Sequence, residues 1–143
     1  MAPSSERKQR LLKAWAAAWD HGDVDALDSL LSPRYRRRTR SSIEGQTREE
    51  LKALILTSRM AFPNLTTVVE EIVEEGDRLA VRWRSSGTHT GFFMGVPPTK
   101  KPVTVAGATF ALFDGDMIVE EWVTWDAREL LSALGVLTVG EQR

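Results

Sequence analysis

Hydrophobic residues in the first 63 positions recur three and four residues apart, which is the spacing of a helix with one apolar face. Capping residues, glycine and proline mark where such helices begin and end. The pattern predicts three helices: one from Ser4 or Ser5 to His21-Gly22, a second from Asp23 to the residue before Pro33, and a third from the capping box Thr47-Arg48-Glu49-Glu50 to Pro63. The stretch from Arg34 to Arg40 is expected to be an irregular or edge segment.

After Pro63 the pattern changes to an alternation of apolar and polar residues, which is typical of strands with one buried face. It predicts strands at about 65 to 74, 78 to 87, 102 to 113 and 117 to 125, and then a helix from Ala127 to Leu134. Helices followed by an antiparallel meander indicate an α+β fold, in which a curved antiparallel sheet wraps around the N-terminal helices. We expect a single domain over residues 1–143, with frayed tails at 1–5 and 138–143.

Alternation also predicts which side chains face the helices. On the strand at 78 to 87, odd positions carry apolar residues and even positions carry two arginines, so Trp83 and Ser85 are expected on the concave face. His89 shares that face if the register continues through Gly87. The strand from Val103 to Phe113 is apolar on both faces, so its sequence does not orient it. We expect both of its faces to be covered, one by the helices and one by a partner subunit.

The connection from Gly87 to Thr99 is expected to be wide and shaped. It has three glycines within nine residues, and Pro97-Pro98 fixes two φ angles. It also carries Phe92, Phe93 and Met94 close to His89. Aromatic residues beside flexible glycines are typical of the rim of a pocket, and a packed hairpin loop is the alternative interpretation.

Composition narrows the possible partners. With 42% hydrophobic residues, 27% charged residues and a net charge of −1, the chain has no overall attraction for nucleic acid or for an anionic membrane. The chain has no cysteine, which excludes disulfides and thiolate chemistry, and no metal or cofactor is expected. No apolar stretch approaches the roughly 20 residues of a membrane span, so a cytoplasmic location is expected. The arginines of Arg34 to Arg40 fit a solvated edge strand, or guidance of an anionic substrate or carrier protein.

Three titratable residues are candidate catalytic groups: His89, Asp126 and Glu121. Histidine exchanges protons near neutral pH, and a histidine–carboxylate pair could abstract a proton next to a carbonyl or deliver water to an electrophile. Alternation sends Glu120 and Glu121 to opposite faces, so at most one of them enters a cavity. Asp126 follows the last strand and could instead cap the helix that begins at Ala127. A histidine that only fixes its loop is the structural alternative for His89.

Large apolar and aromatic side chains predict a hydrophobic pocket. Five tryptophans in so short a chain favour a flat hydrophobic ligand, polycyclic or terpenoid. Tyr35, the only tyrosine, could hold a ligand hydroxyl at the pocket mouth. The candidate wall residues are Trp15, Trp19, Tyr35, Met60, Phe62, Trp83, Phe93, Met94, Phe110 and Trp122, and core packing is the alternative for each.

Three motifs carry a family resemblance. The run His89-Thr90-Gly91-Phe92-Phe93-Met94-Gly95-Val96-Pro97-Pro98-Thr99-Lys100, then Phe113 to Trp122, then Asp126 to Gly135, resembles the SnoaL-like polyketide cyclase family. The resemblance spans Leu11 to Leu137. It implies the cone-shaped fold shared with nuclear transport factor two, usually as a homodimer, and implies a reaction only weakly because the family covers several chemistries.

The same resemblance implies where a cyclase site would lie. In the aldol-type cyclases of the family, a catalytic aspartate and a polar pair that includes histidine occupy positions that align with Val123, Ala106 and Ala108. All three residues are apolar here, so they are kept as pocket residues and not as catalytic groups. The Asp-Arg-Asp arrangement of the related limonene epoxide hydrolases has no counterpart around Arg82-Trp83-Arg84.

Two functions remain compatible with the sequence. One is a cofactor-independent enzyme that acts on a small hydrophobic, polyketide-like or terpenoid-like molecule by acid/base chemistry, giving cyclisation, isomerisation, hydration or epoxide opening. The other is a noncatalytic binding or accessory protein of the same fold. His89 and family precedent favour the enzyme, whereas the apolar Ala106, Ala108 and Val123 favour the binding protein.

Overall fold

A computed structural model describes residues 5–136 of the chain, so the predicted tails lie almost wholly outside the described residues. Its elements are α1 (Glu6–Trp15), a π-helical turn η1 (Ala16–Asp20), a 3-10 helix η2 (Val24–Ser29), β1 (Leu31–Thr39), β2 (Ser42–Gln46), α2 (Arg48–Ala61), β3 (Thr66–Glu75), β4 (Arg78–Thr88), β5 (Pro102–Asp114), β6 (Met117–Trp125) and α3 (Ala127–Ala133). The predicted α+β class and the four-strand meander are therefore confirmed.

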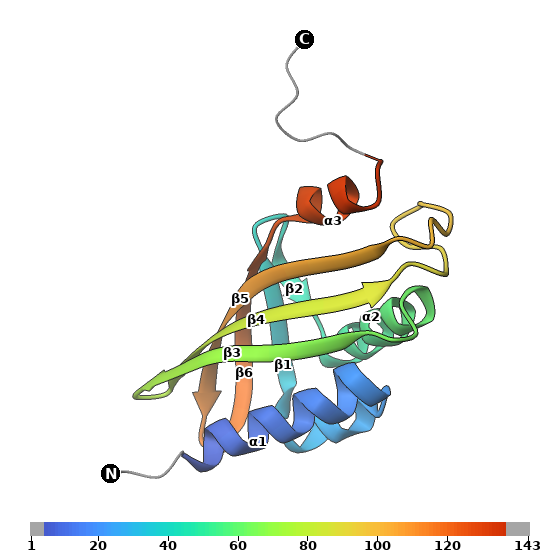
Figure 1. The fold of residues 1–143 in the computed structure, drawn as a ribbon. Helices are drawn as coiled ribbons and strands as arrows, with labels where there is room; N and C mark the ends of the chain where they lie inside the picture. Colours follow the sequence, from blue (N-terminus) through green and yellow to red (C-terminus); the bar gives the residue numbers. More distant parts are fainter. Residues whose placement is uncertain (1–4, 137–143) are drawn as a thin grey trace.

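The strands form one curved sheet in the order β2-β1-β6-β5-β4-β3 (Figure 1). The meander from β3 to β6 is antiparallel, as predicted, but β1 pairs with β6 in parallel. The prediction of a purely antiparallel sheet is therefore wrong, and the Arg34 to Arg40 stretch lies in and just after a strand with a neighbour on each side. The arginines of this strand hide its alternation in the sequence. Tyr35 is buried, whereas Arg38 lies on the outer face and forms an ion pair with Glu120 at 2.9 Å.

The hydrophobic core lies between the concave face of the sheet and the N-terminal helices. Figure 1 shows α1 across one end of the sheet and α3 at the other end. Helix residues such as Leu11, Leu27 and Ile55 pack with strand residues such as Val81 and Ala111, and all five are at most 1% exposed. The helices thus cover the same face of β4 that the alternation predicted.

Local sequence signals set the ends of the helices. Ser5 accepts a hydrogen bond from the backbone N–H of Lys8 at 3.0 Å and caps α1. Thr47 and Glu50 form the predicted reciprocal capping box of α2. The predicted second helix is shorter than expected and is a 3-10 helix. Among residues 5–136, no helix is long and apolar enough to cross a membrane.

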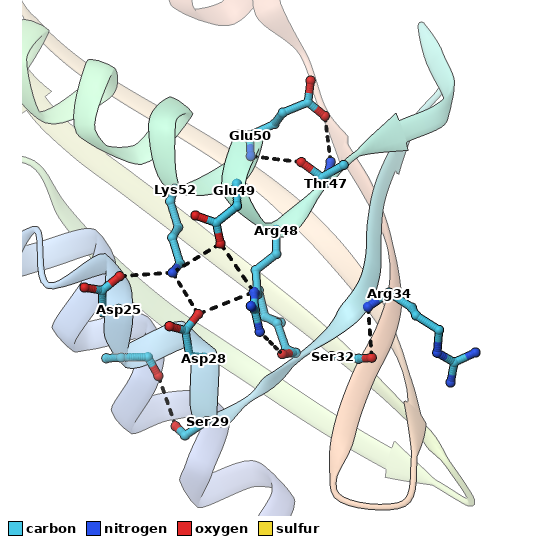
Figure 2. Close-up of polar contacts among 12 residues, drawn as sticks. Asp25, Asp28, Ser29, Ser32, Arg34, Thr47, Arg48, Glu49, Glu50 and Lys52 are labelled. Atoms are coloured by element: carbon cyan, nitrogen blue, oxygen red, sulfur yellow. Dashed lines mark hydrogen bonds and ion pairs between the residues drawn. The ribbon is translucent and has the colours of Figure 1, made fainter.

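An ion-pair cluster joins α2 to η2 (Figure 2). The Lys52 ammonium lies 2.8 Å from Asp28, 3.0 Å from Asp25 and 3.4 Å from Glu49, although the residue is only 7% exposed. The hydrogen bond to Asp28 raises the pKa of Lys52, and the same bond holds the pKa of Asp28 below its ordinary value of 3.8. These contacts fix the helices over the concave face.

We expect Lys52→Met to lower the free energy of unfolding by about 0.5 to 1 kcal/mol at neutral pH, because it removes the ion pairs to three partly exposed carboxylates, two of which keep Arg48. Because the pKa of Asp28 is lowered on folding, its contribution is present above its ordinary pKa and is lost as the pH falls below about 4. Urea unfolding from about pH 2 to pH 7 measures the difference from wild type, which should shrink towards low pH. Lys13→Met, at an exposed position of α1, is the matched control. An equal effect of the two substitutions would contradict the prediction.

The outer face of the sheet carries exposed apolar side chains. Phe110 and Trp122 are partners across β5 and β6, and they are 51% and 39% exposed. Both were predicted to line the pocket, and this prediction is wrong because they lie on the face opposite to the helices. That a partner subunit covers this face stays a prediction.

Candidate functional site

A cavity of about 380 Å³ lies between the concave face of the sheet and the helices. Most of its wall is apolar, a composition typical of a site for a small hydrophobic molecule. The apolar lining residues are Trp15, Trp19, Leu27, Leu31, Leu51, Leu54, Phe62, Leu65, Trp83, Phe93, Val103, Val105, Val123, Trp125 and Leu130. The polar ones are Arg37, Thr39, Ser41, Ser42, Gln46, Ser58, Thr67, Ser85, Ser86, Thr109 and Glu121.

Strand register brings the inward side chains of β5 and β6 together. Thr109 is the cross-strand partner of Val123, and Ala111 is the partner of Glu121. Because alternate residues share a face, Glu121, Val123 and Trp125 follow one another along the cavity wall. The Glu121 side chain therefore lies on the same face as the apolar Val123 and Trp125.

Glu121 is the buried acid of this cavity. It is 4% exposed, its Oε1 accepts a hydrogen bond from the Tyr35 hydroxyl, and its Oε2 has no partner among the described residues. Burial raises the pKa of this carboxyl above its ordinary 4.5, against the opposing effects of the Tyr35 hydrogen bond and the nearby Arg37. A buried carboxylic acid whose pKa is raised holds its proton more tightly than a solvated one, and it is suited to act as an acid or a base towards a bound ligand.

Tyr35 is a buried partner of Glu121. Its side chain is 1% exposed, and burial and the neighbouring Glu121 raise its pKa well above 10. The phenol therefore stays protonated and donates to the carboxyl group. Tyr35 was predicted to hold a ligand hydroxyl at the pocket mouth, but the structure places it behind Glu121 and outside the lining.

Arg37 is the cationic residue of the lining. Its Nη1 donates to Oε1 of Gln46 at 3.1 Å, and in the parallel pair of β1 and β6 it is the register partner of Glu121. Arg37 and Glu121 are the only charged residues in the described lining. They do not form an ion pair with each other among the described contacts.

The middle of the sheet is held by Trp83. Its Nε1 donates to Oγ1 of Thr109 at 3.0 Å, and its ring lies over Gly107, its partner on β5. A Cβ atom at Gly107 would come within 2.4 Å of the ring, so only glycine leaves room for it. The hydroxyls of Ser85 and Thr67 pair at 2.8 Å. These inward polar groups are therefore satisfied within the protein.

His89 does not have the environment predicted for it. Its side chain is fully buried and stacks on Phe62 with ring centroids 5.3 Å apart, but it is not part of the cavity lining. Its Nδ1 accepts from the backbone N–H of Thr99 at 3.2 Å and lies 3.1 Å from the Thr99 hydroxyl. Nε2 has no partner within residues 5–136, and no carboxylate there bonds to the ring. The structure thus gives the predicted histidine–carboxylate pair no support, and His89 fixes the start of its loop.

The other two carboxylates lie away from the cavity. Asp126 accepts from the backbone N–H of Arg128 at 2.9 Å and caps α3, and this bond holds its pKa below the ordinary value. It is the cap that the sequence offered as the alternative. Glu120 faces outward and pairs with Arg38, which leaves Glu121 as the carboxylate that enters the cavity.

The structure divides the predicted wall residues. Trp15, Trp19, Phe62, Trp83, Phe93 and Val123 line the cavity, and their contact with a ligand stays a prediction. Met60 and Met94 are outside it and exposed, at 78% and 54%. Ala106 and Ala108 lie on the outer face with Phe110, so the prediction that they line the pocket is wrong.

Sequence reasoning missed several lining residues. Trp125 shares a face with Glu121, so alternation alone could have found it. Strands β1 and β2 contribute Arg37, Thr39 and Gln46 to the lining. No local sequence pattern predicts that β1 pairs with β6. Among the described residues, no group of three or more His, Cys, Asp or Glu side chains could hold a metal ion.

The architecture is the cone-shaped α+β fold shared with nuclear transport factor two. The chain belongs to the SnoaL-like polyketide cyclase family, whose pattern matches residues 9–134. A comparison with curated protein sequences found no match.

Several solved structures are similar over nearly their whole length. AclR from Streptomyces galilaeus, described as a candidate hydroxylase, is 32% identical, with 92% of this chain and 97% of AclR covered and a TM-score of 0.81. TsrD from Streptomyces laurentii is 25% identical, with coverages of 95% and 100% and a TM-score of 0.84. IdmH from Streptomyces antibioticus, described as a candidate polyketide cyclase, is 27% identical, with coverages of 92% and 100% and a TM-score of 0.80.

Proposed function

We propose that this protein is an enzyme that performs acid/base chemistry on a small hydrophobic, polyketide-like or terpenoid-like molecule, with Glu121 as the group that moves the proton. The observation that carries the proposal is the buried Oε2 of Glu121, which has no partner among residues 5–136 and lies on the wall of a mostly apolar cavity. Leaving a buried carboxyl oxygen without a partner costs stability, so a catalytic use explains why it is kept.

The surroundings of Glu121 suit both directions of proton transfer. In its protonated form the carboxyl can donate to a carbonyl or epoxide oxygen of the ligand. The carboxylate that remains is stabilised by the Tyr35 hydroxyl and by the charge of Arg37. It can then remove a proton from a carbon next to the carbonyl, which completes an enolisation, isomerisation or cyclisation without a net change in the enzyme.

The apolar wall has two roles in this mechanism. Trp15, Trp19, Trp83 and Trp125 offer flat surfaces that hold a ring system, and they exclude water that would compete for the proton. Two similar structures, AclR and IdmH, are described as a candidate hydroxylase and a candidate cyclase, so their descriptions name two different chemistries. The proposal therefore specifies proton transfer and leaves the bond that is formed or broken to the substrate.

The test is proton exchange in an enolisable bicyclic ketone. 2-Tetralone is incubated in heavy water with wild type, Glu121→Gln or Glu120→Gln, and loss of the proton signal next to the carbonyl is followed by NMR. We expect protein-dependent exchange with wild type and with Glu120→Gln, because Glu120 faces away from the cavity. Glu121→Gln should be slower by about 100-fold or more, which is the range of general acid–base catalysis.

Two results would contradict the proposal. Equal exchange by wild type and Glu121→Gln would remove Glu121 from the chemistry. Binding of the ketone without any protein-dependent exchange would favour the noncatalytic binding protein.

A further inference from the structure

Part of the cavity wall is polar. The turn between β1 and β2 lies at the opposite end of the sheet from α1 (Figure 1). Close to that turn the lining includes Arg37, Thr39, Ser42 and Gln46, whereas α1 contributes Trp15. A ligand that fills this space meets hydrogen-bonding side chains from β1 and β2 and aromatic surface from α1, β4 and β6.

We propose that Arg37 forms a carboxylate-binding subsite, and that the natural ligand is a flat apolar molecule that carries a carboxylate. The subsite lies beside Glu121 in the same cavity, so the inference extends the proposed function to a substrate class. Its own evidence is the hydrogen bonding of Arg37, and it does not require that Glu121 be catalytic.

The first argument is that Arg37 and Glu121 are neighbours but form no ion pair with each other among the described contacts. They are register partners on adjacent strands, yet Arg37 donates to Gln46 and Glu121 accepts from Tyr35. The other guanidinium nitrogens of Arg37 and the buried Oε2 of Glu121 have no protein partner among the described residues. A purely structural pair would satisfy both groups with a salt bridge. Gln46 instead positions the guanidinium, whose other N–H groups can still donate to a ligand.

The second argument is the chemistry of the donors. A guanidinium offers only N–H groups, in a planar fork that matches the two oxygens of a carboxylate. Glu121 accepts from Tyr35 and does not take up the guanidinium, so Arg37 keeps N–H donors for a ligand. Arg37 is the cationic residue of the lining, and it forms no ion pair among the described contacts. An anionic group supplies the missing partner, and a cationic ligand would be repelled.

The experiment compares two ligands that differ in charge. Dissociation constants of 2-naphthoic acid and of 2-naphthalenemethanol are measured by isothermal titration calorimetry at neutral pH for wild type, Arg37→Met, Arg36→Met and Glu121→Gln. Arg36 is exposed on the same strand and is the matched control. We expect wild type to bind the acid about tenfold more tightly than the alcohol, as charge-assisted hydrogen bonds are the stronger kind.

Arg37→Met should remove this preference and leave the alcohol affinity within about twofold, since it removes a charge and keeps an apolar side chain. Arg36→Met should retain the preference. The inference is overturned if wild type does not bind the acid more tightly than the alcohol, or if Arg37→Met keeps the preference. Glu121→Gln should also retain the preference for the acid. Loss of isotope exchange therefore tests the proposed function, and loss of the acid preference tests this inference.

Discussion

Glu121→Gln is expected to have a free energy of unfolding about 1 to 2 kcal/mol higher than that of wild type at neutral pH, because it removes a charge that burial opposes, while the group at the place of Oε2 still lacks a partner among residues 5–136. The amide keeps an oxygen that can accept from the Tyr35 hydroxyl and removes the charge that burial opposes. The substitution thus keeps the shape of the site while removing its least stable feature.

The sign of the pH dependence follows from the pKa of Glu121. Folding raises this pKa above 4.5, so the native state binds the proton more tightly than the unfolded chain. Wild-type stability must therefore fall as the pH rises through the range between the two pKa values. Glutamine does not titrate, so the advantage of Glu121→Gln should be small near pH 4 and should grow towards neutral pH.

Urea unfolding between about pH 4 and pH 8 measures this difference. Glu120→Gln is the control, because it changes a carboxylate that is paired with Arg38 on the outer face. Its effect should be a small loss of stability at neutral pH. A wild-type protein that is as stable as Glu121→Gln at every pH would show that burial of Glu121 costs nothing, and would weaken the case for a retained function.

The opposed effects expected of Glu121→Gln on stability and on proton exchange are typical of an active-site residue. Catalytic groups are often held in surroundings that destabilise the native state, because these surroundings also tune the group. If a residue is kept only for packing, its replacement lowers the free energy of unfolding of the protein. Measuring both properties on one variant therefore tests whether the buried acid is retained for chemistry.

The parts of the fold that local sequence determines were predictable. The alternation from β3 to β6 and the capping signals of Ser5 and Thr47 depend on neighbouring residues, and the structure confirms them. The parallel pairing of β1 with β6 was not predictable, because it joins segments about 80 residues apart with no local signal. That pairing brings Tyr35 and Arg37 to Glu121, so the electrostatics of the candidate site were not visible in the sequence.

Alternation predicts the face of a residue but not what covers it. His89 is buried, as the register through Gly87 allows, but Phe62 and the loop at Thr99 enclose it. Ala106 and Ala108 were placed in the pocket by the family resemblance alone, and the register of β5 puts them on the outer face. Glu121 could be narrowed to one of two adjacent acids, and only the structure shows which one lies inside.

Tyr35→Phe is expected to lower the free energy of unfolding by about 1 to 3 kcal/mol at neutral pH, which is the penalty for leaving a buried charged acceptor without its donor. The phenol is 1% exposed and donates to Oε1 of Glu121, so the variant loses this hydrogen bond without losing the ring. The Tyr35 hydrogen bond lowers the pKa of Glu121 against the effect of burial. Its removal should therefore raise that pKa further, and the acidic limb of the isotope-exchange profile should move to higher pH.

The stability loss should depend on pH and on Glu121. The bond favours the charged carboxylate, so the loss should be largest at neutral pH and smaller near pH 4, where the carboxyl is neutral. In the Glu121→Gln background the same substitution removes only a bond between neutral groups, so it should cost less, and the double-mutant cycle measures the coupling. A loss that is the same at every pH and in both backgrounds would mean that Tyr35 acts through packing alone. Glu121 would then owe its protonation state to burial and Arg37, and Tyr35 would have no part in tuning it.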